Sequence, residues 1–180
     1  MGVGTGGLFH ERSADEIEHL VALNVLTTME LTRQVLPGMI ERGRGRIVMI
    51  SSAAALAALP GMAAYSATKA AISHFAAGLR ADLKGLPVDV TLVQVGFVTP
   101  TELAARALAY PPTGAAHRRF LRLGLLVDTD LHKLSAAVVD GVAHDRRQVL
   151  RPRRLKGFAA MTEGPRRMTE LILAGVKPRV

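Results

Sequence analysis

The sequence predicts an α/β domain on a doubly wound parallel sheet of about three strands, and three observations carry this prediction. First, RIVMIS (46–51) and VDVTLVQV (88–95) are apolar runs of strand length, which is typical of strands buried on both faces. Second, helical patterns separate these runs, and crossovers of that length join parallel strands. Third, RQVLRP (147–152) is a short strand candidate after another helical segment.

Helices are expected around and between these strands. Ser13 followed by Glu16 forms a capping box, and apolar residues recur helically as far as Leu36, so the first helix is expected to end at Pro37-Gly38. A second helix, over 63–84, is expected after Pro60-Gly61. The helices expected later, each bounded by Gly, Pro or polar residues, cover 103–109, 130–144 and 158–174.

Length and composition indicate one domain over residues 1–180. Apolar residues make up 49% of the chain, cysteine is absent, and no apolar run reaches the roughly 18 residues of a membrane span. We expect a soluble, cytoplasmic protein. The six histidines show no metal-ligand spacing, so no metal site is expected.

The formal net charge of +8 is concentrated in HDRRQVLRPRRLKG (144–157) and Arg166-Arg167. A solvated surface is one interpretation of this basic segment. Contact with an acyl carrier or an anionic membrane is another. No nucleic-acid-binding pattern accompanies the charge, so we expect no nucleic-acid partner.

Tyr65 and Lys69 in YSATK (65–69) are the first candidates for chemistry. They lie one turn apart on the expected helix and therefore share a face. A neighbouring ammonium favours the phenolate and lowers the pKa of a tyrosine towards the range useful for proton transfer. Ser52 follows RIVMIS, at the carboxyl end of a strand, where open α/β sheets build their sites.

Several motifs occur together and in order: Asn24-Val25, Leu36-Pro37, GRIVMISS (45–52), Pro60-Gly61, YSATKAAI (65–72) and VDVTLVQVGFV (88–98). In this combination the chain closely resembles the short-chain dehydrogenase/reductase family. The resemblance implies a Rossmann-like fold and hydride transfer between NAD(H) or NADP(H) and a carbonyl or secondary alcohol. It covers residues 1–103 as a catalytic core, and it implies a variable substrate-binding part over 104–180.

The resemblance also implies roles for single residues. Tyr65 would be the catalytic acid/base, and Lys69 would lower its pKa and bind the nicotinamide ribose. Ser52, rather than its neighbour Ser51, would orient the substrate oxygen, and Asn24 would complete a catalytic tetrad. Gly96, Val98 and Thr99 would contact the cofactor, with Thr101 as the alternative to Thr99. Val95-Gly96 stands where the family usually has Pro-Gly.

The family's phosphate loop, Thr-Gly-x-x-x-Gly-x-Gly, does not occur in this sequence. By resemblance the chain starts near the end of the family's fourth strand, so the N-terminal half of the fold is expected to be missing and about 80–90 further residues to precede it. We therefore expect the 180 residues alone to be inactive and poorly soluble. The choice between NAD and NADP is open.

Substrate and partners follow less directly. The segment from Phe97 to Val127 is rich in apolar residues, which favours a small apolar carbonyl or alcohol substrate. Small residues on the helix over 63–84 favour a homo-oligomer. The alternative to an enzyme is a truncated, non-catalytic paralogue that keeps the dimerisation surface and the basic tail.

Overall fold

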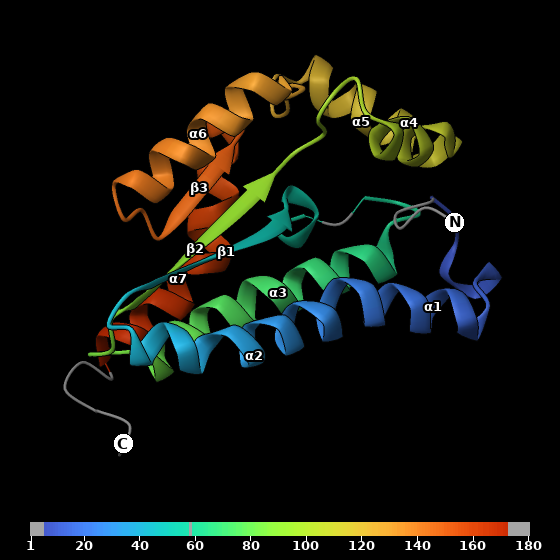
Figure 1. Ribbon diagram of the computed structural model, residues 1–180. Helices are drawn as coiled ribbons and strands as arrows, with labels where there is room; N and C mark the ends of the chain where they lie inside the picture. The colour runs from blue at the N-terminus through green and yellow to red at the C-terminus, as the bar shows by residue number, and fades with distance from the viewer. Residues whose placement is uncertain (1–5, 58, 173–180) are drawn as a thin grey trace.

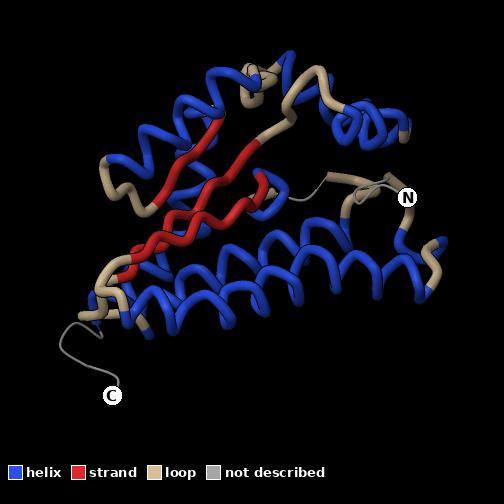
Figure 2. The backbone as a smooth tube through the Cα atoms, in the orientation of Figure 1, coloured by secondary structure: helices blue, strands red, loops and turns tan. Residues whose placement is uncertain are grey.

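The structure is a computed structural model that describes residues 6–57 and 59–172. It has a three-stranded parallel sheet in the order β1-β2-β3, flanked by helices on both faces (Figures 1 and 2). In chain order the elements are η1 (Phe9–Glu11), α1 (Ala14–Val21), η2 (Ala22–Leu26), α2 (Thr27–Glu41), β1 (Gly45–Ser52), η3 (Ala53–Ala55), α3 (Ala63–Asp82), β2 (Val88–Val95), α4 (Glu102–Ala109), α5 (Pro111–Arg122), α6 (Leu131–Ala143), β3 (Gln148–Arg151), η4 (Arg153–Leu155) and α7 (Lys156–Ile172).

The sheet confirms the predicted topology. β1 and β2 pair in parallel along their full length, from Gly45 opposite Val88 to Ser52 opposite Val95. The shorter β3 pairs in parallel with the carboxyl half of β2. The carboxyl ends of β1 and β2 therefore lie side by side, at the edge where a site is expected.

Two apolar layers hold the sheet between its helices. On one face α2 and α3 run side by side beneath β1 and β2 (Figure 1), around a core that includes Met49, Ile72 and Leu92. On the other face α6 covers β2 and β3, with Val93 and Val149 buried beneath it. α3 is thereby held against the strand that carries Ser52.

β1 differs from the prediction that it is buried on both faces. Met49 is 1% exposed, but Val48 and Ile50, on the opposite face, are 37% and 53% exposed. The reason is positional: β1 is an edge strand of the described sheet, and α6 packs on β2 and β3 instead. Apolar composition alone does not distinguish this arrangement from burial on both faces.

The first helix starts as predicted but does not end as predicted. The Ser13 hydroxyl accepts from the Glu16 amide at 3.2 Å, and the Glu16 carboxylate accepts from the Ser13 amide at 3.0 Å. The helix then continues through Pro37 to Glu41. Met39 and Ile40 pack against the core, and this burial outweighs the backbone hydrogen bond that proline cannot donate.

The segment after β2 contains a helix that the sequence analysis missed. α5 begins at Pro111, directly after the point where the helix over 103–109 was predicted to end. Proline is well suited to the first turn of a helix, because its missing amide hydrogen would have no partner there. The helices predicted over 103–109 and 130–144 are confirmed as α4 and α6. Residues 1–5 and the last residues of the predicted terminal helix (173–174) lie outside the described residues.

Among the described helices, none combines the length and the apolar character needed to cross a membrane. Within the same residues, no cluster of histidine, aspartate or glutamate has the composition of a metal site.

Candidate functional site

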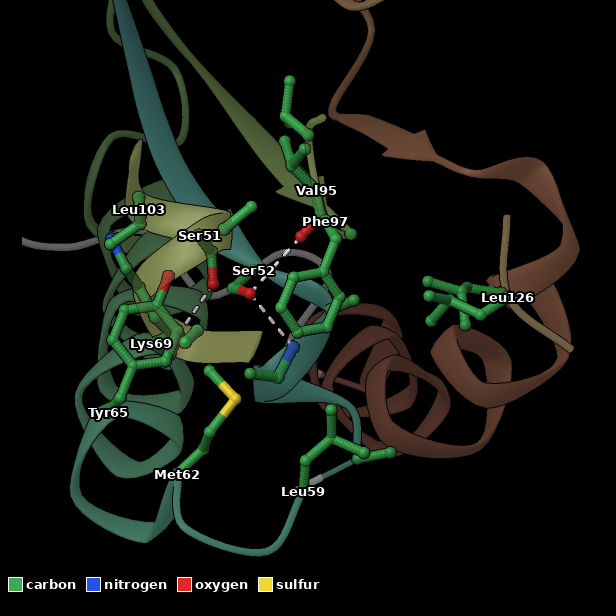
Figure 3. A pocket seen from close by; sticks show the side chains of 18 of the residues that line it. Ser51, Ser52, Leu59, Met62, Tyr65, Lys69, Val95, Phe97, Leu103 and Leu126 are labelled. Atoms are coloured by element: carbon green, nitrogen blue, oxygen red, sulfur yellow. Dashed lines mark hydrogen bonds between the residues drawn. The ribbon is translucent and has the colours of Figure 1, made fainter. Parts of the chain in front are cut away.

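A cavity of about 270 Å³ opens at the carboxyl ends of β1 and β2 (Figure 3). Its polar side is formed by Ser52 at the end of β1 and by Tyr65 and Lys69 on α3. The rest of its wall is largely apolar and comes from several elements, including Met62, Phe97, Leu103, Phe120, Leu126 and Phe158. The predicted residues of the acid/base group therefore share one hollow with an apolar surface.

The Ser52 hydroxyl is fixed by the backbone at the strand end. It accepts from the Ala54 amide at 3.1 Å and lies 3.3 Å from the Val95 carbonyl, to which it donates. The Ser52 side chain also favours the phenolate of Tyr65 and so lowers the pKa of that phenol. Ser52 is thus positioned between the two strands and the tyrosine (Figure 3).

Lys69 lies beside Tyr65 but is held by β1. Its Nζ donates to the Ile50 carbonyl at 3.1 Å and sits 5.8 Å from the centre of the Tyr65 ring. Removal from water lowers the pKa of the Lys69 ammonium. The lysine is a cation near the tyrosine, in a partly desolvated position.

The pKa of Tyr65 does not follow the sequence prediction. We expected Lys69 to lower it, but burial raises the pKa of the Tyr65 phenol, and the interaction with Ser52 only partly opposes that rise. The physical cause is that a phenolate loses its hydration in this cavity. Tyr65 is therefore held in its protonated form at neutral pH, the form that can donate a proton.

The structure separates the two candidate serines by direction. Ser52 faces the cavity, whereas the hydroxyl of Ser51 points to α3 and donates to the Lys69 carbonyl at 2.8 Å. Both residues are part of the cavity wall, but alternate residues of a strand point to opposite faces, so the two hydroxyls have different surroundings. The Ser51 hydroxyl is thus bound to α3, and the substrate-orienting role of Ser52 stays a prediction.

Asn24 lies apart from the cavity wall, in the π-helical turn η2 between α1 and α2. Its Nδ2 donates to Thr68 Oγ1 at 3.0 Å, and the Thr68 hydroxyl donates to the Tyr65 carbonyl at 2.8 Å. Its own carbonyl accepts from the Thr28 hydroxyl at 3.0 Å. Asn24 thus contacts the backbone of the YSATK segment through Thr68, and its catalytic role stays a prediction.

The residues predicted to contact a cofactor divide into two groups. Gly96 and Val98 line the cavity, whereas Thr99 does not. The Thr99 amide instead donates to the Thr129 carbonyl at 3.3 Å. Thr101 reaches the cavity wall, donates to the Val98 carbonyl at 2.7 Å and caps α4. Of the two threonines, the structure places Thr101 at the cavity.

Four residues close the cavity from the far side: two lie in the apolar segment from Phe97 to Val127 that was predicted to bind the substrate, and the two beyond that segment were missed. Phe120, Leu126, Leu155 and Phe158 come from α5, a loop, η4 and α7, and they meet in one apolar cluster. No local pattern marks these positions, because their contacts are between segments far apart in the chain. Met62 could have been placed near the cavity from the sequence, because it directly follows the Pro60-Gly61 turn that leads into α3.

Comparison with known proteins identifies sequences that are similar to this chain. The chain is 47% identical over 86 residues to an uncharacterised short-chain type dehydrogenase/reductase of Sinorhizobium fredii, covering 48% of this chain and 35% of that protein. It is 39% identical over 95 residues to the NADP-dependent 3-hydroxy acid dehydrogenase of Escherichia coli, covering 53% of this chain and 38% of the relative. The chain thus spans well under half the length of these relatives.

A solved structure agrees with the fold. The closed form of a serine dehydrogenase complexed with NADP+ superposes with a TM-score of 0.68 at 30% identity, over 83% of this chain and 60% of the other. The sequence profile of the short chain dehydrogenase family matches residues 1–110, well over half of the chain. The chain therefore belongs to the short-chain dehydrogenase family, whose members are oxidoreductases.

Proposed function

We propose that this chain contributes the proton-transfer site of an NAD- or NADP-dependent oxidoreductase that interconverts a carbonyl and a secondary alcohol. The observation that carries the proposal is the shared cavity of Ser52, Tyr65 and Lys69 at the carboxyl ends of β1 and β2. Family membership supports oxidoreductase chemistry, and the NADP-dependent relative supports the cofactor class.

In the proposed reaction, Tyr65 donates its proton to the carbonyl oxygen as hydride arrives at the carbonyl carbon. The Ser52 hydroxyl binds the same oxygen and orients it towards the phenol. The Lys69 ammonium, 5.8 Å from the Tyr65 ring centre, stabilises the phenolate left after the transfer. The reverse reaction takes the alcohol proton back to Tyr65.

The described residues fit the nicotinamide end of such a cofactor. Lys69 and the backbone at Gly96 lie at the strand ends, where Lys69 could bind the ribose hydroxyls and Gly96 the ring. When bound, the nicotinamide supplies or accepts the hydride. Within the described chain, no strand leads through a glycine-rich turn into a helix that could bind the pyrophosphate.

The cavity favours an uncharged, apolar substrate. Among the described residues that line it, Lys69 is the only one with a charged side chain, and its ammonium is already bound to the Ile50 carbonyl. A substrate carboxylate would lose hydration there without a dedicated cation. We therefore propose a ketone or secondary alcohol with apolar substituents, in contrast to the acid named for the 3-hydroxy acid dehydrogenase. The apolar wall contributed by residues 104–180 supports a substrate-binding role for that part of the chain.

Two partner proposals remain. Exposed apolar side chains on α2, among them Leu31 and Val35, support self-association into a homo-oligomer. The exposed cations Arg153, Arg154 and Lys156 support contact of the basic segment with an acyl carrier or an anionic membrane.

The test measures NADH and NADPH oxidation at 340 nm with a panel of substrates. Apolar aryl and alkyl ketones should be reduced, and at saturating cofactor their kcat/KM should exceed that for 3-oxo acids by at least about tenfold. Preference for the acids would contradict the apolar assignment. Because the 180 residues alone are expected to be inactive, the assay uses this chain joined to an N-terminal half that carries a glycine-rich phosphate loop. Absence of turnover with every substrate in that folded, self-associating protein would favour the non-catalytic interaction module instead.

A further inference from the structure

Three successive residues of β1 contact the Tyr65/Lys69 pair. The Ile50 carbonyl accepts from Lys69 Nζ at 3.1 Å, and the Ser51 hydroxyl donates to the Lys69 carbonyl at 2.8 Å. Ser52 lines the same cavity as Tyr65 and favours its phenolate. Lys69 is therefore held by β1 at both its backbone and its ammonium, and the strand sets the position of both side chains (Figure 3).

The Ser51 hydroxyl is the last member of a buried chain of polar groups. Gln148 Nε2 donates to Gln94 Oε1 at 2.6 Å, and Gln94 Nε2 lies 3.4 Å from the Ser73 hydroxyl. The Ser73 and Ser51 oxygens are 2.8 Å apart. These hydrogen-bonded groups thus lead from β3 across β2 to β1 and α3, and the last bond is to the carbonyl of Lys69.

Hydrogen-bond direction is consistent along this chain. If each group donates to the next one, from Gln148 to Ser51, the Ser51 proton is left for the Lys69 carbonyl; the Ser73 hydroxyl, 3.1 Å from the same carbonyl, is its alternative donor. Gln94, Ser73 and Ser51 are 0%, 1% and 3% exposed, so water does not compete for these bonds. Bonds in such a chain polarise one another and fix a single geometry. An apolar core would hold the layers together without that directional control.

We propose that Ser51 is a positioning residue, which keeps α3 in register with β1 so that Lys69 and Ser52 both remain within reach of Tyr65. Its importance for turnover rests on the proposed function, but its effect on the Tyr65 phenol does not. Nothing in the sequence distinguished this role from that of Ser52, because the two serines are adjacent and chemically alike.

The test follows the ionisation of Tyr65 by its phenolate absorbance near 295 nm. The chain has two tyrosines, so a Tyr110→Phe background leaves Tyr65 as the reporter. In that background Ser51→Ala should move the titration to higher pH, because the interaction with Ser52 favours the phenolate and weakens when the register loosens. Ser51→Thr keeps the hydroxyl and should restore the midpoint.

A matched control separates positioning from general loss of stability. Thr91→Val removes another buried hydroxyl, which donates to the Arg146 carbonyl at 2.9 Å away from the cavity. It should lower the melting temperature without moving the Tyr65 titration. Circular dichroism confirms that each variant is folded at the titration pH. If Ser51→Ala unfolds, Ser73→Ala gives the second measurement and should shift the titration in the same direction.

The outcomes are distinct. An unchanged or lowered Tyr65 midpoint in a folded Ser51→Ala chain, or the same shift in Thr91→Val, overturns the positioning role. The titration uses neither cofactor nor substrate, so it gives its result whether or not the chain transfers hydride. Full turnover by a Tyr65→Phe variant would refute the proposed function and leave the titration result intact.

Discussion

Truncation of two neighbouring residues of β1 tests the one-sided burial of that strand. Met49→Ala removes a side chain that is 1% exposed, in the core between the sheet and α3. Ile50→Ala removes one that is 53% exposed, on the opposite face of the same strand. The two changes delete side chains of similar size within the same backbone pairing.

The magnitudes follow from burial. Met49→Ala should lower the free energy of unfolding by about 2–5 kcal/mol, because it leaves a cavity in a packed core. Full burial of an isoleucine contributes about 1.5–3 kcal/mol, so a half-exposed one should cost only about 1 kcal/mol. A difference of about 2 kcal/mol corresponds to roughly thirtyfold in the folding equilibrium.

Urea unfolding, followed by far-ultraviolet circular dichroism, measures both values. Equal m-values for the two variants would show that the comparison concerns stability and not the extent of unfolding. If Ile50→Ala costs as much as Met49→Ala, the outer face of β1 is covered in solution and the reasoning is refuted. Val48→Ala, on the same outer face, serves as a second reference.

Three further predictions concern charge and surface. Burial lowers the pKa of Lys69, so keeping its ammonium charged reduces the stability of the fold at neutral pH, and this cost disappears as the pH rises through the unfolded-state pKa. Lys69→Met should therefore keep or raise the melting temperature, while kcat falls at least about a hundredfold. A melting temperature well below that of the wild type would contradict this sign. Burial raises the pKa of Tyr65, so ketone reduction should be independent of pH near neutrality and should fall only as alkaline pH ionises the phenol; a fall in kcat centred near pH 7 would count against it. Leu31→Glu on α2 should reduce self-association in sedimentation velocity, whereas Val139→Glu on α6, an exposed position away from that helix, should not; equal effects would place the interface elsewhere.

Local signals in the sequence predicted much of the fold. β2 begins and ends where the apolar run does, and the capping box at Ser13 starts α1 as expected. Both signals depend on neighbouring residues, which the sequence displays directly. The continuation of α2 through Pro37 could not be predicted in this way, because it depends on the packing of Met39 and Ile40 against a distant sheet.

The sequence predicted which residues share the site, but not the direction in which the Tyr65 pKa is shifted. Ser52, Tyr65 and Lys69 share the cavity, as the motif spacing indicated. The raised pKa of Tyr65 was not foreseen, because it follows from burial in the folded chain, which the spacing of Tyr65 and Lys69 does not show. The role of Ser51 depends on side-chain direction, which becomes visible only when β1 and α3 are packed together.

The most direct measurement of the central claim is hydride transfer by Tyr65→Phe beside Tyr110→Phe. Removal of the Tyr65 hydroxyl deletes the proposed proton donor and keeps the ring that fills the cavity wall. In NADPH-dependent reduction of an apolar ketone by this chain joined to a phosphate-binding N-terminal half, Tyr65→Phe should lose at least about a hundredfold in kcat, with cofactor affinity and melting temperature retained, while Tyr110→Phe should keep full turnover. Wild-type kcat in Tyr65→Phe would contradict the account.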